Sequence, residues 1–325
     1  MSQLGAIGID LGGTNLKLAL LDGDNRILAR HTVPTAGAEG HEAVIQRMIE
    51  GVEALRASAL DSAVAGIGVG VPGMVDMAAG VTGDLPNLPG RWGNVPVGPA
   101  ISAATGLPVG VINDAKAFAL AEHRLGAATG TGDALFVTVG TGIGGAIVAG
   151  GRIVFGLGGA AGEIGHLIVQ PAGPPCTCGN SGCVETLASG PAIAAEGMRR
   201  IVQGFTTALT QLCQGDLNAV TPELIALAAD NGDPAAREIL DRAGYWLGIG
   251  LAGGIAMTAP EVVVFGGGVA PAGSRYAISA EAAARAHCGV TDIDRIEFRP
   301  AALGYDAGVI GAALWGRLTA KGETG

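Results

Sequence analysis

The fold is decided by residues 7–33, IGIDLGGTNLKLALLDGDNRILARHTV. Three apolar runs lie in this stretch, at residues 7–10, 16–21 and 26–33. The turns between them are rich in glycine and aspartate, and the first is Gly12-Gly13. Short apolar runs separated by such turns predict three strands in a meander.

The meander returns in residues 134–155, where we expect strands at 134–139, 143–149 and 152–155. A pattern that occurs twice predicts an internal duplication. With 325 residues, the chain is also long enough for two α/β lobes, which implies a cleft between them.

The other segments are expected to complete the lobes. Further strands are predicted at 64–71, 109–112, 262–265 and 295–298. Helices are predicted at 42–56, 115–125, 191–202, 205–212, 222–229, 234–257, 274–286 and 306–318. We expect the last helix to fold back on the first lobe. The loop at 72–96, rich in glycine and proline, is typical of a binding loop.

Composition excludes several classes of protein. Apolar residues make up 49% of the chain and charged residues 15%, which is not the composition of a disordered protein. The net charge is -10 without a cluster of lysine and arginine, so nucleic acid is not an expected partner. The uncharged residues 243–260 contain glycines and end at Pro260, which predicts a buried helix rather than a membrane span. The amino-terminal residues show no secretory signal, and we expect the cytoplasm.

The first turn has the residues of a phosphate site. Gly12 and Gly13 allow a tight turn whose N–H groups face a phosphate, and Thr14 adds a hydroxyl. Asp10 precedes the turn and is expected to hold Mg²⁺ or its waters, while Lys17 follows it. The alternative is a simple hairpin turn.

The second meander repeats this turn as Gly140-Thr141-Gly142-Ile-Gly144. Two such hairpins, facing each other across the cleft, would grip one polyphosphate. A strand follows the glycines rather than a helix, which excludes a Rossmann dinucleotide site. Gly266-Gly267-Gly268 follows a buried strand and permits close approach of a flat ring or a ribose, although a plain turn explains it too.

Asn113-Asp114 lies where a strand ends and a helix begins, a usual place for ligands in α/β sheets. A carboxylate there is ionised at neutral pH and is a candidate general base. The alternative is that Asp114 only caps the helix.

A metal loop is indicated by His166, Cys176, Cys178 and Cys183. Four protein ligands leave no vacant position, so the metal is expected to be a structural zinc ion. Glu163 and Glu185 flank the loop, either as ligand contacts or as solvated acids. Three thiols in one loop also suit a reducing compartment.

The motifs together resemble the ROK family of sugar kinases and repressors, and within it the bacterial glucokinases. The resemblance covers nearly the whole chain and is carried by residues 10–17, 71–76, 113–115, 140–145, 161–166 and 176–190. It implies an actin-like ATPase fold of two ribonuclease-H-like lobes. The expected domains are residues 1–113 with 303–325, and residues 114–302 with the zinc loop 166–183.

The resemblance also implies an activity, the ATP-dependent phosphorylation of a hexose, with glucose 6-phosphate as the product. Asp114 matches the general base and a sugar contact. The other residues that match sugar contacts are Asn87, Asn113, Glu163, His166 and Glu185. The glycine hairpins match the phosphate loops, and Gly266 to Gly268 match the adenosine side. The implied cofactors are ATP, Mg²⁺ and structural Zn²⁺, and the implied assembly is a homodimer or higher homo-oligomer.

Two alternatives remain. The substrate is another hexose, such as mannose, fructose, allose or an N-acetyl-hexosamine, because the family shares its sugar contacts among several hexoses. The other is a sugar-sensing transcriptional regulator without catalysis. The acidic charge and the position of Asp10, close to Met1, favour the kinase.

Overall fold

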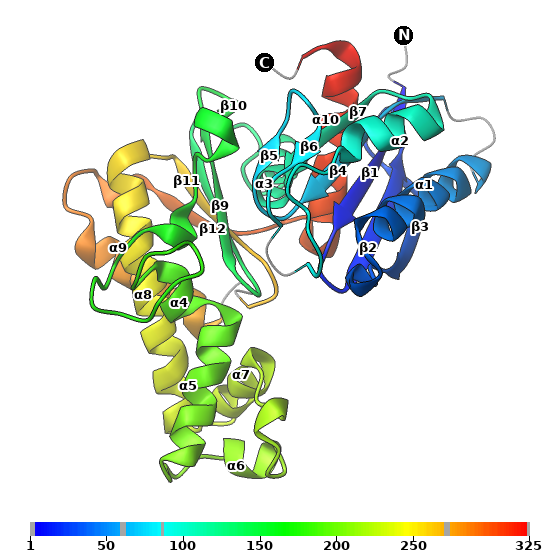
Figure 1. The fold of residues 1–325 in the computed structure, drawn as a ribbon. Coiled ribbons are helices and arrows are strands. Elements are labelled where there is room, and N and C mark those ends of the chain that lie inside the picture. The colour runs from blue at the N-terminus through cyan, green and yellow to red at the C-terminus, as the bar shows by residue number, and fades with distance from the viewer. Residues whose placement is uncertain (1–3, 59–62, 86–87, 270–273, 324–325) are drawn as a thin grey trace. The chain divides into compact units, whose positions relative to one another are not determined.

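The computed structural model describes residues 4–58, 63–85, 88–269 and 274–323. The chain divides into two compact units, each built on a five-stranded sheet (Figure 1). Unit 1 comprises Met1–Thr129, Phe155–Ala161 and Leu303–Gly325, and unit 2 comprises Gly130–Val154 and Gly162–Ala302. The predicted α/β class with two sheet-containing lobes is confirmed.

The two sheets share one strand order, β3-β2-β1-β4-β7 in unit 1 and β10-β9-β8-β11-β12 in unit 2. In each, the first three strands along the chain pair antiparallel and the last two add in parallel. The strands of unit 1 are β1 (Gly5–Leu11), β2 (Asn15–Leu21), β3 (Ile27–Pro34), β4 (Val64–Val71) and β7 (Val109–Asn113), with a small hairpin of β5 (Val75–Asp76) and β6 (Val81–Thr82). The strands of unit 2 are β8 (Ala134–Val139), β9 (Ile143–Ala149), β10 (Arg152–Ile153), β11 (Val262–Gly266) and β12 (Glu297–Pro300). The predicted duplication is therefore confirmed.

Helices complete both units. Those of unit 1 are α1 (His41–Ser58), α2 (Val97–Thr105), α3 (Asp114–Leu125) and α10 (Ala307–Lys321), with short 3-10 turns η1 (Gly37–Glu39), η2 (Leu157–Gly159) and η6 (Gly304–Asp306). Those of unit 2 are α4 (Val184–Ala188), α5 (Gly190–Val202), α6 (Leu209–Leu212), α7 (Pro222–Asp230), α8 (Pro234–Thr258) and α9 (Arg275–His287), with η3 (Ile164–His166), η4 (Leu217–Ala219) and η5 (Ile293–Arg295). No helix in the described part of the chain combines the length and apolar character that a membrane crossing needs.

Helix α10 packs directly on the sheet of unit 1, as predicted for the last helix. Glycines make this contact possible. A Cβ atom at Gly8 of β1 would lie 1.9 Å from the Val309 carbonyl oxygen, and one at Gly68 of β4 would lie 1.7 Å from that of Ala312. Backbone therefore meets backbone, and α10 covers the strands whose ends carry Asp10 and Asn113.

Helix α8 is the centre of unit 2, and its glycines explain the long uncharged stretch. A Cβ atom at Gly244 or Gly248 would lie 2.4 Å from a carbonyl oxygen of α9. One at Gly250 would lie 2.6 Å from Val184, so α8 also supports α4. The stretch is helical, as predicted, but only one face of it is buried, and Tyr245 and Met257 are exposed.

One of the two predicted unit boundaries differs in the structure. The boundary predicted at 302/303 lies there, but the one predicted at 113/114 lies at 129/130, and residues 155–161 return to unit 1. The reason is packing: α3 lies against α10, where a Cβ atom at Gly311 would be 1.7 Å from the Ala117 carbonyl oxygen. Phe155 likewise packs against Trp315 of α10, with tilted rings whose centroids are 5.3 Å apart.

Candidate active site and metal centre

The first glycine hairpin joins β1 to β2. It is closed by a hydrogen bond of 3.1 Å from the Gly12 amide to the Asn15 carbonyl. A Cβ atom at Gly12 would lie 2.8 Å from that carbonyl oxygen, so the tight turn requires glycine. Among the residues that the structure describes, none accepts a hydrogen bond from the amide of Gly13 or Thr14. Two adjacent donors are thus available to an anion.

Thr35 supports this hairpin through hydrogen bonds to its carbonyls. The sequence around Thr35 does not indicate this role. Its side chain is fully buried. Its hydroxyl donates to the Gly12 carbonyl at 2.6 Å, and its amide donates to the Thr14 carbonyl at 2.9 Å. Its own carbonyl accepts from Arg47 of α1 at 3.2 Å. The carbonyls of Gly12 and Thr14 are therefore both engaged.

Asp10 lies near the end of β1, beside the first turn of α10. A Cβ atom at Gly308 would lie 2.9 Å from the Asp10 carboxylate, so the two are closely packed. Burial raises the pKa of the Asp10 carboxyl above its usual range, and Lys17, 3.7 Å away, partly opposes this. The Lys17 ammonium also lies 3.3 Å from the centre of the Tyr305 ring. A divalent cation would favour the charged carboxylate further.

Asn113 and Asp114 lie at the same edge of the sheet as Asp10. The register pairs Asp10 with Gly70 and Val71 with Asn113, which puts Asp10 and Asn113 about 10 Å apart, two strand spacings. The Asn113 side chain caps α3 by accepting from the Lys116 amide at 3.2 Å.

Because Asn113 is the cap, the alternative in which Asp114 only caps the helix is wrong. Asp114 is the first residue of α3, and its Oδ1 accepts from the Ala115 amide at 2.8 Å and from Asn113 Nδ2 at 3.1 Å. Asn113 Nδ2 also donates to the Gly73 carbonyl at 3.1 Å. The carboxylate is therefore oriented by its neighbours.

The second glycine hairpin joins β8 to β9 and resembles the first. Its Gly140 amide donates to the Gly142 carbonyl at 2.9 Å, and the Gly140 carbonyl accepts from Gly190 at 2.9 Å. The amides of Thr141 and Gly142 have no acceptor within the described part of the chain. Each unit thus carries, at the same place in its repeat, a turn with two adjacent open donors.

The segments that carry the predicted residues of unit 2 pack against this hairpin. Glu185 accepts from the Ile143 amide at 2.8 Å. Glu163 and His166 flank Gly165, where a Cβ atom would lie 2.0 Å from the Ile143 carbonyl oxygen. Gly267, with a φ of 87°, approaches the Val139 carbonyl oxygen equally closely, at 2.2 Å for a Cβ atom.

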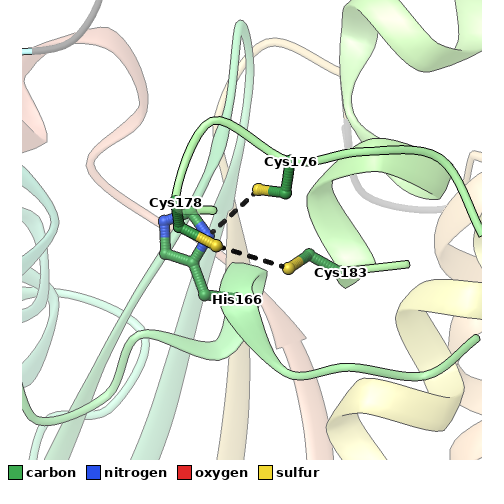
Figure 2. Close-up of side chains that lie close together, drawn as sticks. All are labelled: His166, Cys176, Cys178 and Cys183. Carbon is green, nitrogen blue, oxygen red and sulfur yellow. Dashed lines mark hydrogen bonds between the residues drawn. The ribbon is translucent and has the colours of Figure 1, made fainter. Parts of the chain in front are cut away.

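The metal loop is assembled as predicted (Figure 2). The ligand atoms of His166, Cys176, Cys178 and Cys183 all lie within 4.8 Å of one another. Cys176 Sγ is 3.6 Å from His166 Nδ1, and Cys178 Sγ is 3.7 Å from Cys183 Sγ. These separations match the edge of about 3.8 Å of a tetrahedron with Zn–S bonds of about 2.3 Å. The donor set therefore fits zinc.

The protonation of the Cys183 thiol bears on metal binding. Burial, together with the neighbouring thiols, raises the pKa of the Cys183 thiol to about 12. Without a metal ion, this thiol stays protonated at neutral pH. A metal that binds thiolates would reverse the preference.

A cavity of about 580 Å³ lies within unit 1, where the sequence marked only a binding loop. It is lined by Met74–Ala79, Val81–Gly83, Asn94, Gly156, Gly158 and Gly159. Met74 follows Gly73, whose carbonyl binds Asn113, so the cavity adjoins the end of β7. Asn87 lies outside the described residues. Nearby, the loop is anchored by the buried Trp92, whose carbonyl accepts from Thr82 at 2.7 Å.

Comparison with known proteins identifies the family of the chain. The ROK family model matches residues 6–318. The glucokinase of Halalkalibacterium halodurans is 35% identical over 314 residues, 96% of this chain and 94% of that protein. The N-acetylmannosamine kinase of Escherichia coli O157:H7 is 33% identical over 95% of this chain and 97% of its own length.

Among solved structures, a ROK family glucokinase from Streptomyces griseus, in complex with glucose and AMPPNP, is 32% identical with a TM-score of 0.84. That similarity covers 96% of this chain and 99% of the other. The sequence motifs, the repeated sheets and the family model agree over almost the whole length. The chain belongs to the ROK family.

Proposed function

We propose that the protein is an ATP-dependent hexose kinase that phosphorylates the 6-hydroxyl of glucose. The observation that carries the proposal is the pair of glycine hairpins, each with two adjacent open amides at the turn of a repeated meander. Paired phosphate clips suit a polyphosphate donor. Similarity to glucokinases over almost the whole chain supports the reaction and the substrate.

Asp114 is the proposed general base. A carboxylate at this position is able to accept a proton. The 6-hydroxyl oxygen of the sugar forms a bond to the γ-phosphorus, while the bond from that phosphorus to the β,γ-bridging oxygen breaks and ADP leaves. The hydroxyl proton passes to the Asp114 carboxylate.

The sugar is positioned by carboxylates, an imidazole and amides. His166 directs Nδ1 at the metal loop, which leaves Nε2 for a hydroxyl group. Zinc would hold this ring in one orientation when bound. The residues proposed as sugar contacts are Asn87, Asn113, Glu163, His166 and Glu185.

The nucleotide is held by backbone donors. The amides of the two hairpins bind phosphate oxygens, and the loop Gly266–Gly268 takes the adenosine side. Asp10 is a carboxylate of the kind that Mg²⁺ prefers, and with Lys17 it completes the proposed nucleotide site. When bound, Mg²⁺ neutralises charge on the β- and γ-phosphates.

A panel of hexoses assayed with ATP and Mg²⁺ tests the substrate. ADP release is measured with glucose, mannose, fructose, allose, N-acetylglucosamine and N-acetylmannosamine. We expect the highest kcat/KM for glucose. N-acetylmannosamine is the second candidate, because a kinase named for it is 33% identical. If sugars bind but none of them causes ADP release, the result would contradict the proposal and favour a regulator.

The remaining attributes belong to the same proposal. We expect a homodimer or higher homo-oligomer in the cytoplasm, with one structural zinc ion per chain. Light scattering and metal analysis of the purified protein measure the assembly and the zinc content.

A further inference from the structure

We infer that Glu185 is a positioning residue for the second glycine hairpin, in addition to the sugar contact proposed for it. The inference rests on the proposed function, because it assumes that this hairpin binds the nucleotide phosphates. It adds that the nucleotide site depends on a side chain of the sugar site.

The central contact is the hydrogen bond from the Ile143 amide to Glu185 Oε2, at 2.8 Å. Ile143 is the first residue of β9 and pairs with Val139 across the hairpin. It directly follows Gly142, one of the two residues with an open amide. A charge-assisted bond at this point orients the peptide next to the donors.

The carboxylate also packs against the tip of the hairpin. A Cβ atom at Gly142 would lie 2.5 Å from Glu185 Oε2 and 3.4 Å from Cδ. The backbone of Gly142 is not in the left-handed region, so its conformation does not require glycine. A Cβ atom at this position would instead meet the Glu185 carboxylate. Side chain and hairpin thus fit each other closely.

Glu185 is held firmly enough to act as a support. It is the second residue of α4, which begins at its N-cap Cys183, a residue of the metal loop. The contact between Gly250 and Val184 fixes the same helix from the other side. Just beyond α4, the Gly190 amide donates to the Gly140 carbonyl. One short segment, residues 183–190, therefore holds both ends of the hairpin.

Two effects of the carboxylate on phosphate binding oppose each other. Its acceptor oxygen orders the hairpin, which favours binding, while its negative charge repels phosphate. Glutamine keeps an acceptor oxygen and removes the charge, whereas alanine removes both. The two substitutions therefore separate the support from the repulsion.

The test is calorimetric titration of AMPPNP with Mg²⁺, without sugar, into wild-type protein and the Glu185→Ala and Glu185→Gln variants. We expect Glu185→Ala to weaken AMPPNP binding about tenfold, as the loss of one charge-assisted hydrogen bond implies. Glu185→Gln should bind AMPPNP at least as tightly as wild type. Both variants should bind glucose more weakly.

Glu223→Ala is the matched control, because Glu223 is likewise the second residue of a helix of unit 2, α7, and is exposed. It should leave AMPPNP binding unchanged. Zinc content is measured for every variant, and Glu185→Asp, which is one methylene too short, replaces the alanine variant if that one does not fold.

The outcomes separate the inference from the proposed function. If wild-type protein binds AMPPNP and Glu185→Ala binds it equally well or more tightly, the inference is wrong and the kinase proposal stands. If Glu185→Gln loses as much AMPPNP affinity as Glu185→Ala, the hydrogen-bond acceptor for Ile143 does not explain the loss, and the inference is also wrong. If wild-type protein binds no AMPPNP, the proposed function fails and the inference with it.

Discussion

Replacing Asp114 with asparagine is the perturbation that bears most directly on the chemistry. Asparagine has the same shape and keeps an oxygen for the Ala115 amide and Asn113 Nδ2, but it cannot take up a proton at neutral pH. The helix cap is the Asn113 side chain, which the substitution leaves in place. The fold should therefore tolerate Asp114→Asn.

The expected effects of Asp114→Asn on stability and on turnover differ enough to be distinguished. Loss of a carboxylate from the first turn of α3 costs about 0.3–1 kcal/mol of helix-dipole interaction. For a chain of this size, that lowers Tm by at most about 4 °C. Loss of a general base lowers kcat by about 10²- to 10⁴-fold. This corresponds to about 3–5 kcal/mol of activation free energy.

The assay is steady-state ADP release with saturating ATP and glucose, accompanied by calorimetric glucose binding and thermal unfolding. We expect kcat to fall at least about a hundredfold, with glucose affinity nearly unchanged. Glu42→Gln is the matched control, because Glu42 is an exposed acidic residue in the first turn of α1, also in unit 1. It should leave kcat at the wild-type value. Near-normal turnover of Asp114→Asn would refute the base assignment.

Three further predictions concern the supports of the site. Removing zinc with a chelator, or by Cys183→Ser, should weaken glucose binding more than AMPPNP binding, because the proposed sugar contact His166 is in the loop and Glu185 directly follows it. Equal losses of glucose and AMPPNP affinity in parallel titrations would contradict this. Thr35→Val should leave the Gly12 carbonyl unpaired, lower the free energy of unfolding by about 1–3 kcal/mol and raise KM for ATP. Thr35→Ser keeps the hydroxyl and should restore most of the stability and of the KM. A valine variant with wild-type stability and KM would be inconsistent with the hydrogen bond. Because burial raises the pKa of Asp10, its ionisation costs stability as pH rises above the unfolded value of about 3.9. Asp10→Asn should therefore unfold at the same urea concentration as wild type near pH 3 and at a higher concentration near pH 7, and it should lose activity. A variant less stable than wild type at pH 7 would contradict the expected sign of the stability change.

Features encoded by local pattern could be predicted from the sequence. The two meanders follow from apolar runs and glycine turns, and the metal loop follows from the spacing of Cys176, Cys178 and Cys183 after His166. Helix α8 follows from length and lack of charge. In each case, the residues that define the feature are close together in the sequence.

Individual hydrogen bonds between distant residues could not be predicted. Thr35 meets Gly12 only because β3 returns beside β2, and Glu185 meets Ile143 across 42 residues. Nothing near either residue in the sequence marks its partner. The choice of Asn113 over Asp114 as helix cap is equally invisible, because both are good capping residues.

Two helices differ from the prediction for identifiable reasons. No helix was predicted where α2 lies, and its sequence contains Gly98 and Pro99. Both lie in its first turn, where proline is tolerated. The helix predicted over 205–212 is only α6, Leu209–Leu212. Asp233 accepts hydrogen bonds from Thr207 and from the Ala208 amide, which holds the preceding residues out of the helix.

The predicted strand at 295–298 is displaced for a similar reason. It lies at Glu297–Pro300, in register with β11, whose Val262 pairs with Glu297. Arg285 of α9 takes the carbonyls of Ile293 and Ile296, which keeps those residues in a turn. Tertiary hydrogen bonds thus decided where the strand begins.

The most direct test of the central claim is to follow wild-type protein with ATP, Mg²⁺ and glucose by ³¹P NMR. The account predicts that one phosphomonoester, glucose 6-phosphate, appears for each ATP converted to ADP, and that 6-deoxyglucose yields none. Conversion of ATP to inorganic phosphate, or no ATP consumption with glucose or any other hexose, would contradict it.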